Sequence, residues 1–150
     1  MQNILHIYLI ITLFAILSLS CEDNRRSPIP DYPVHLELDL LGEYNTFKGS
    51  VGECLTFTTP RLATDRLGFG GILVCTNLFG EYCAFDLACP YEVEREVRVR
   101  PENLVAVCSK CGSQFDLGNT AMGIPAKGPA KDPLKKYKTQ ETGGKLVIFR

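Results

Sequence analysis

Three features of the sequence predict an all-β fold. Residues 34–40 (VHLELDL) alternate apolar and polar side chains without interruption, which is typical of a strand with one buried face. Short runs rich in β-branched and aromatic residues recur along the chain, and Gly, Pro and Asn separate them. Residues 34–150 show no helical period. We therefore expect a small antiparallel β sandwich or barrel over these residues.

The expected strands are short, and turn residues bound them. After residues 34–40 we expect strands at residues 54–59, 72–75, 81–86, 97–100, 104–107 and 145–149. Pro60 ends the second strand, and Gly68-Phe69-Gly70-Gly71 forms the turn before the third. A second glycine pair, Gly143-Gly144, forms the turn before the last strand.

The strands at 97–100 and 104–107 are expected to form a hairpin that turns at Pro101-Glu102-Asn103. Cys89 precedes this hairpin and Cys108 closes it. Because the two ends of a hairpin lie side by side, we expect Cys89 and Cys108 to meet in space.

The first 20 residues are expected to be a secretion signal. Residues 2–20 contain no Asp, Glu, Lys or Arg, and a run of that length is enough to cross a bilayer. The sequence Ser18-Leu19-Ser20-Cys21 resembles the lipobox of bacterial lipoproteins, in which the signal is cleaved and the cysteine receives the lipid. It departs from the lipobox because Ser18 stands where Leu is usual, and because no Lys or Arg precedes the apolar run. An uncleaved anchor helix is the alternative.

This resemblance divides the chain into a lipoprotein signal peptide (1–20), a lipidated Cys21 with a flexible polar tether (21–33), and a folded domain (34–150). It implies a protein anchored to a membrane through lipid on Cys21. The domain would then lie outside the cytoplasm, at the periplasmic face or the cell surface of a bacterium. An uncleaved anchor helix would place it in the same compartment.

Charge and histidine content argue against two classes of function. Sixteen Lys and Arg residues against 17 Asp and Glu residues give a net charge of −1, which argues against a nucleic-acid partner. The two histidines are His6, inside the signal, and His35, on the first strand. One histidine in the mature chain gives no basis for a hydrolytic triad, so we expect no self-contained enzyme.

Seven cysteines are present, at positions 21, 54, 75, 83, 89, 108 and 111. Lipidation uses Cys21, and the remaining six would lie in an oxidising compartment, where they are enough for three disulfides. Disulfides alone therefore account for every remaining cysteine, and the count by itself requires no metal.

Two short cysteine loops form the most informative motif. Cys89-Pro90-Tyr91 is followed by 16 residues and then by Cys108-Ser109-Lys110-Cys111-Gly112-Ser113. Two loops that each present two groups at the ends of paired strands suit a four-ligand metal site. The motif resembles that of the Rieske domain, which has Cys-x-His, a similar spacer and Cys-x-x-His-Gly-Ser. Gly128-Pro129-Ala130 and Tyr137 also look like that family's proline-bearing loop and return strand.

The resemblance implies a Rieske-like antiparallel β domain with a rubredoxin-like cluster-binding subdomain at about residues 87–125. Cys89 and Cys108 match the two cysteine ligands of a Rieske [2Fe–2S] cluster. Tyr91 and Cys111 stand where that family has its two histidines. The mature chain has one histidine, so it cannot supply the His₂Cys₂ ligand set from its own residues.

Three interpretations of the altered site remain open. The first is a [2Fe–2S] cluster held by Cys89, Cys108 and Cys111, with Tyr91, Cys83 or an outside group as the fourth ligand. The second is zinc on the same thiolates. The third is no metal, with Cys89 bonded to Cys108 or Cys111.

These interpretations lead to two functional hypotheses. The first is a membrane-anchored electron carrier with a non-standard [2Fe–2S] site, whose thiolate ligands would lower its potential below that of a Rieske centre. Its partner would be an unidentified redox protein. The alternative is a structural or binding lipoprotein on a degenerate Rieske scaffold, metal-free and disulfide-stabilised or held by zinc. In that case exposed loops, or the lysine-rich residues 127–138, would contact the partner.

Overall fold

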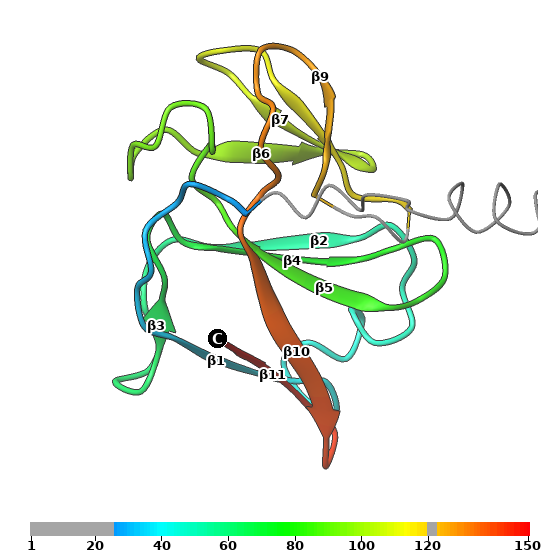
Figure 1. Cartoon of the computed structure of the whole chain (residues 1–150). Coiled ribbons are helices and arrows are strands. Elements are labelled where there is room, and N and C mark those ends of the chain that lie inside the picture. The colour runs from blue at the N-terminus through cyan, green and yellow to red at the C-terminus, as the bar shows by residue number, and fades with distance from the viewer. Residues whose placement is uncertain (1–25, 120–122) are drawn as a thin grey trace, which may run out of the picture.

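A computed structural model describes residues 26–119 and 123–150 (Figure 1). Its regular elements in this part of the chain are all strands, which confirms the predicted all-β class. They are β1 Val34–Asp39, β2 Cys54–Phe57, β3 Arg66–Leu67, β4 Ile72–Thr76, β5 Tyr82–Asp86, β6 Val99–Glu102, β7 Val105–Cys108, β8 Gln114–Asp116, β9 Pro125–Lys127, β10 Lys136–Thr142 and β11 Lys145–Phe149. The described residues hold no helix that is long and apolar enough to cross a membrane.

Seven strands form one antiparallel sheet in the order β2-β4-β5-β10-β11-β1-β3. The sheet curls, so that β2, β4 and β5 lie opposite β1 and β11, with β10 joining the two sides (Figure 1). The apolar residues of the alternating β1 sequence point into this curl, as their spacing predicts. They pack with buried side chains of β4 and β11, among them Ile72, Val74, Leu146 and Ile148.

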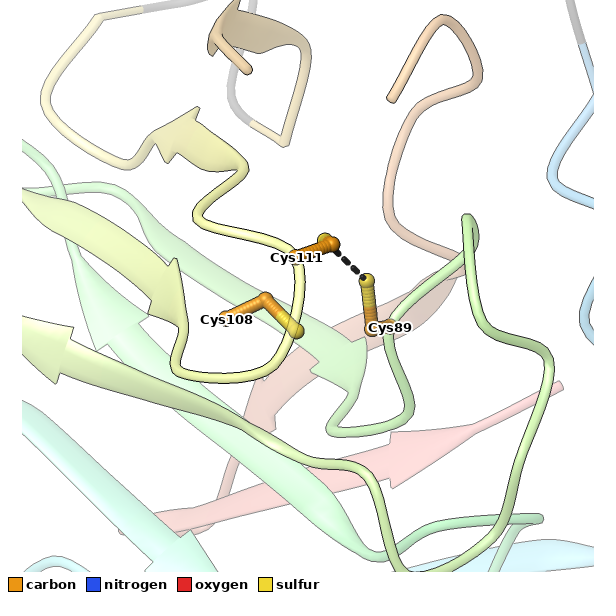
Figure 2. A group of neighbouring side chains, drawn as sticks. All are labelled: Cys89, Cys108 and Cys111. Carbon is orange, nitrogen blue, oxygen red and sulfur yellow. Dashed lines mark hydrogen bonds between the residues drawn. The ribbon is translucent and has the colours of Figure 1, made fainter. Parts of the chain in front are cut away.

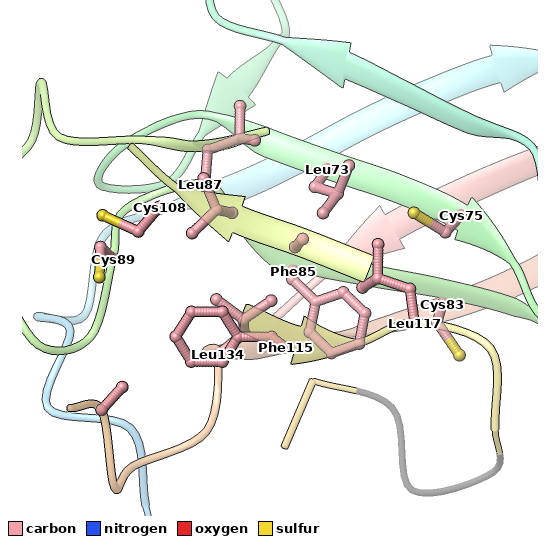
Figure 3. Close-up of a cluster of buried hydrophobic side chains, with 13 residues drawn as sticks. Leu73, Cys75, Cys83, Phe85, Leu87, Cys89, Cys108, Phe115, Leu117 and Leu134 are labelled. Atoms are coloured by element: carbon pink, nitrogen blue, oxygen red, sulfur yellow. The ribbon is translucent and has the colours of Figure 1, made fainter. Parts of the chain in front are cut away.

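The other four strands form a smaller antiparallel sheet in the order β6-β7-β8-β9. It lies against the outer face of β4 and β5, and a second buried cluster fills the space between the sheets (Figure 3). Strands β4 and β5 are therefore covered on both faces. This explains why Ile72–Thr76 is buried at every position and shows no apolar–polar alternation.

The seven strands expected from the sequence are all present, with ends shifted by at most two residues. One expected turn is wrong, because Pro101 lies inside β6 and the chain reverses at Asn103 instead, where φ is +56°. Strand β6 is the edge of the smaller sheet, where a proline is tolerated because no neighbour needs its missing N–H. Strands β3, β8, β9 and β10 were not among the seven expected strands, although the resemblance placed Tyr137 of β10 on a return strand.

A buried carboxylate on β5 connects the turn before β4 to β10. Asp86, at the end of β5, accepts hydrogen bonds from the N–H groups of Phe69 (2.7 Å), Gly70 (2.9 Å) and Ala88 (2.8 Å). It also accepts the phenol proton of Tyr137 on β10 at 2.6 Å. Asp86 thus holds the turn before β4 and the start of the segment that leads to Cys89.

One disulfide is present among the described residues. Cys54 on β2 and Cys75 on β4 are register partners and are bonded to each other. Cys83 is the register partner of Cys75 on β5, and it is a buried free thiol. The sequence count allowed this pairing but did not select it. Residues 1–25, which include the predicted signal and Cys21, lie outside the described part of the chain.

We predict that Asp86→Ala lowers the free energy of unfolding by about 3–5 kcal/mol, because three buried N–H groups and a phenol lose their acceptor. Urea unfolding followed by circular dichroism measures this change. An unfolding midpoint equal to that of the wild type would contradict the role of Asp86.

Tyr137→Phe is a milder companion variant, which removes one of these hydrogen bonds and is expected to cost about 1–3 kcal/mol. Burial, followed by the nearby charge of Asp86, raises the pKa of Tyr137 far above its ordinary value of 10.0. The contribution of Tyr137 is therefore complete below pH 10 and declines as the pH rises above it. We expect the difference between wild type and Tyr137→Phe to shrink in unfolding measurements above pH 10.

The disulfide is expected to stabilise the domain by about 3 kcal/mol, because it closes a loop with a sequence separation of 21 residues in the unfolded chain. The double variant Cys54→Ala/Cys75→Ala should lose that amount in urea unfolding. Peptide mapping without reduction should recover Cys54 joined to Cys75. Recovery of Cys75 joined to Cys83 instead would contradict the assigned pairing.

Candidate metal centre

The two cysteine loops meet at one end of the smaller sheet. Cys89 follows β5, and its N–H donates to the carbonyl of Val97 at 2.9 Å. Cys108 ends β7 and is the register partner of Val99. The segment at Val97–Val99 therefore has one cysteine on each side, and the prediction that Cys89 and Cys108 meet is confirmed.

Cys111 joins them to form a cluster of three thiols (Figure 2). Their sulfur atoms all lie within 4.8 Å of one another, and the Sγ atoms of Cys89 and Cys111 are 3.7 Å apart. Cys89 and Cys108 are completely buried, and Cys111 is half-buried. No other group of three or more His, Cys, Asp or Glu side chains converges in this way in residues 26–119 and 123–150. In the structure these cysteines are free thiols rather than a disulfide pair.

Backbone N–H groups point at the sulfur of Cys89. Burial raises the pKa of Cys89 to about 12, while hydrogen bonds from the N–H groups of Glu92 and Tyr91 act in the opposite direction. Hydrogen bonds from N–H donors stabilise a thiolate more than a thiol. A bound cation would supply the remaining stabilisation, since metals bind the thiolate form.

Ser113 is placed to stabilise a thiolate at Cys111 in a similar way. The side chain of Ser113 is fully buried, and its Oγ accepts the N–H of Ala130 at 3.0 Å and lies 3.1 Å from the Sγ of Cys111. The hydroxyl proton is therefore available to a thiolate at Cys111. Burial acts to raise the pKa of Cys111, but the hydrogen bonds with Ser113, Cys108 and Cys89 together outweigh it and the pKa falls below its ordinary value.

A lysine ties the two loops together. Lys110, between the two cysteines of the second loop, places its Nζ 2.8 Å from carboxylate oxygens of both Glu92 and Glu94 in the first loop. Lys110 and Glu94 are exposed, so their pair contributes little stability, whereas the side chain of Glu92 is 13% exposed. The two pairs nevertheless connect the first loop to the second. Glu92, Lys110 and Ser113 were not among the ligand residues predicted from the sequence.

Tyr91 and Cys83, the two residues predicted as possible fourth ligands, lie in different surroundings. The side chain of Tyr91 is 55% exposed and lines a surface groove of about 340 Å³ with Pro28, Pro90, Val93, Pro129, Lys131 and Asp132. Its role as a ligand stays a prediction. Cys83 is at the far end of the buried cluster from Cys89 and Cys108, so its assignment as a ligand is wrong (Figure 3). Cys83 is the second residue of β5, so most of that strand lies between it and Cys89.

The lysine-rich segment also has a partly structural role. Lys135 forms an ion pair with Asp31 and donates to the carbonyl of Ile29 at 2.8 Å. Arg150 reaches the same carboxylate at 2.6 Å. These contacts hold the residues before β1 against the C-terminal strands, so Lys135 is committed to the domain itself.

The chemistry of the three donors fits a metal–thiolate centre. Thiolates are ligands of both zinc and iron–sulfur sites, and here N–H and O–H donors surround two of them. The described histidine, His35, is on β1 beside Glu37 and not in either loop. A metal at this site would thus be bound mainly by sulfur, with no imidazole from this part of the chain.

No protein-family model and no curated protein matches this chain significantly. Among solved structures it is similar to a ferredoxin of Sphingomonas yanoikuyae B1, with a TM-score of 0.44 and 19% identity, over 67% of this chain and 90% of that chain. It is also similar to a complex of reduced oxygenase and oxidized ferredoxin in carbazole 1,9a-dioxygenase, with a TM-score of 0.43 and 16% identity, over 67% of this chain and 82% of that chain. Neither likeness is close enough to support an inference about this chain.

We predict that Cys108→Ser reduces the iron or zinc bound per chain at least about tenfold, because a buried thiolate ligand is lost. Cys83→Ser is the matched control, since it alters another buried free cysteine of the same hydrophobic cluster. It should leave the metal content unchanged. Elemental analysis of both purified variants checks this, and equal losses in the two variants would contradict the assigned site.

Proposed function

We propose that this protein is an electron carrier whose redox centre is iron bound by Cys89, Cys108 and Cys111. The convergence of three thiols within 4.8 Å, in loops that already point N–H donors at sulfur, is the observation that carries the proposal. Iron bound there supplies a one-electron ferric/ferrous couple. Either one iron or the two irons of the [2Fe–2S] form expected from the sequence would supply this couple.

The position of the site in the molecule supports this role. Cys89 and Cys108 are buried at the edge of the second hydrophobic cluster, whereas Cys111 is partly exposed. A centre at these sulfurs is shielded from bulk water on one side and close to the surface on the other. An electron could then pass between the centre and a redox protein that contacts the two loops.

The same donor set also suits zinc, which would give the site a purely structural role. The observation that favours this second candidate is the burial of Cys89 and Cys108, because a metal there would join the loops to the core. The identity of the metal distinguishes the two functions. Zinc as the bound metal would make the chain a structural or binding module.

We also propose that the domain is anchored outside the cytoplasm by lipid on Cys21. The lipobox-like sequence and the polar residues that follow it support this. The Cys54–Cys75 disulfide is further support, because such bonds persist in oxidising compartments. Partition of the full chain, but not of Cys21→Ala, into the detergent phase would test the anchor.

Full-length protein extracted in detergent after anaerobic, iron-supplied growth is expected to contain iron and to show thiolate-to-iron absorption bands that bleach on reduction. Its midpoint potential should stay constant between about pH 6 and 9, because no ionisable imidazole belongs to the described donor set. A redox titration at several pH values measures this. Zinc in place of iron, or a potential that falls steadily with pH, would contradict the proposal.

A further inference from the structure

The two cysteine loops share one backbone plan. In the second loop, the N–H of Gly112 donates to the carbonyl of Cys108 at 2.9 Å, and Gly112 has a φ of +73°. In the first loop, the N–H of Val93 donates to the carbonyl of Cys89 at 2.9 Å, and Val93 has a φ of +53°. Each loop therefore closes four residues after its first cysteine with a left-handed residue.

The left-handed conformation of Val93 is unfavourable for its residue type, so the surrounding structure must maintain it in the first loop. A left-handed conformation is ordinary for glycine, but for a β-branched residue it is rare and costs energy. The first loop adopts it nevertheless, and thereby matches the second loop residue for residue. Glu92 in the first loop therefore corresponds to Cys111 in the second loop. Glu92 lies three residues after Cys89, and Cys111 lies three residues after Cys108.

Glu92 has the surroundings of a residue at the site. Its side chain is 13% exposed, and its backbone N–H donates to the sulfur of Cys89. One carboxylate oxygen lies 2.8 Å from the Nζ of Lys110, the residue that directly precedes Cys111. Carboxylate oxygen is a normal ligand of zinc and of other divalent ions, at about 2.0–2.2 Å for zinc.

The spacing of the sulfurs suits a single ion. Sulfur ligands at about 2.3 Å from one tetrahedral ion lie about 3.8 Å apart. The Sγ atoms of Cys89 and Cys111 are 3.7 Å apart. In a Rieske-like [2Fe–2S] arrangement these two positions would belong to different irons, which two bridging sulfides hold farther apart. The three thiols are therefore close enough together to bind one ion.

We propose that the three thiolates bind one tetrahedral metal ion and that the carboxylate of Glu92 is its fourth ligand. This rests on the proposed function, since it uses the same three thiols. Binding requires Glu92 to turn from Lys110 toward the sulfurs. Lys110 keeps its second partner, Glu94, whose carboxylate is also 2.8 Å away. The two loops then contribute two ligands each.

Cobalt(II) titration of the metal-free, reduced full chain in detergent tests this directly. Cobalt reports tetrahedral coordination by the intensity of its ligand-field bands, and each thiolate adds a charge-transfer band. The expected stoichiometry is one cobalt per chain with tetrahedral bands. Glu92→Ala should weaken binding about tenfold or more. Glu92→Cys should keep tetrahedral binding and increase the charge-transfer absorbance, because a fourth thiolate is added.

Glu94→Ala is the matched control, because it removes the other carboxylate partner of Lys110 and should leave the cobalt spectrum and affinity unchanged. Tyr91→Phe should also have no effect. Equal affinities for wild type and Glu92→Ala would overturn the assignment of Glu92.

Iron and sulfide analysis of the iron-loaded wild type tests the single ion independently. One iron and no acid-labile sulfide per chain is the expected result. Two irons and two sulfides would overturn the single-ion site while leaving the electron carrier intact. A wild-type chain that binds neither cobalt nor iron would overturn the proposed function as well.

Discussion

The buried carboxylate of Asp86 is the interaction on which the arrangement of the molecule depends. Its two oxygens accept four hydrogen bonds, from the turn before β4, from Ala88 and from Tyr137 on β10. The turn has no room for a side chain at Gly70, because a Cβ there would lie 2.7 Å from the backbone nitrogen of Ala88. Asp86 thus sets the direction in which the chain leaves β5, and three residues later that direction determines where Cys89 lies.

Strands β4 and β5, which are covered on both faces, lie between the hydrogen bonds of Asp86 and the candidate metal centre in the structure. One face of each strand fills the curl of the larger sheet, and the other face packs on the smaller sheet. Cys89 and Cys108 belong to the second of these clusters, so their sulfurs are part of the hydrophobic interior. A metal bound there would be coupled to folding, because the ligands converge only when the two sheets are packed together.

The sequence predicted part of the site for a sound physical reason. Hairpin geometry is local, so the approach of Cys89 and Cys108 followed from the two strands between them. The position of Cys111 close to both sulfurs depends on the turn of the second loop, including the left-handed Gly112. The role proposed for Glu92 could not be predicted from the sequence, because it depends on the left-handed conformation of the next residue, Val93. Glycine usually provides that conformation, and a valine gives no sign of it.

The sequence by itself determined the all-β class, most of the strands and the pair of cysteine loops, because these follow from local alternation, turn residues and spacing. Only the tertiary structure decided how the cysteines divide into two sets. Cys54 bonds to Cys75 because β2 and β4 are neighbours in register, and Cys83 remains a free thiol on β5. Strand order and register arise from contacts between residues that are distant in the chain, and periodicity within a single strand carries no information about which strand will be its neighbour.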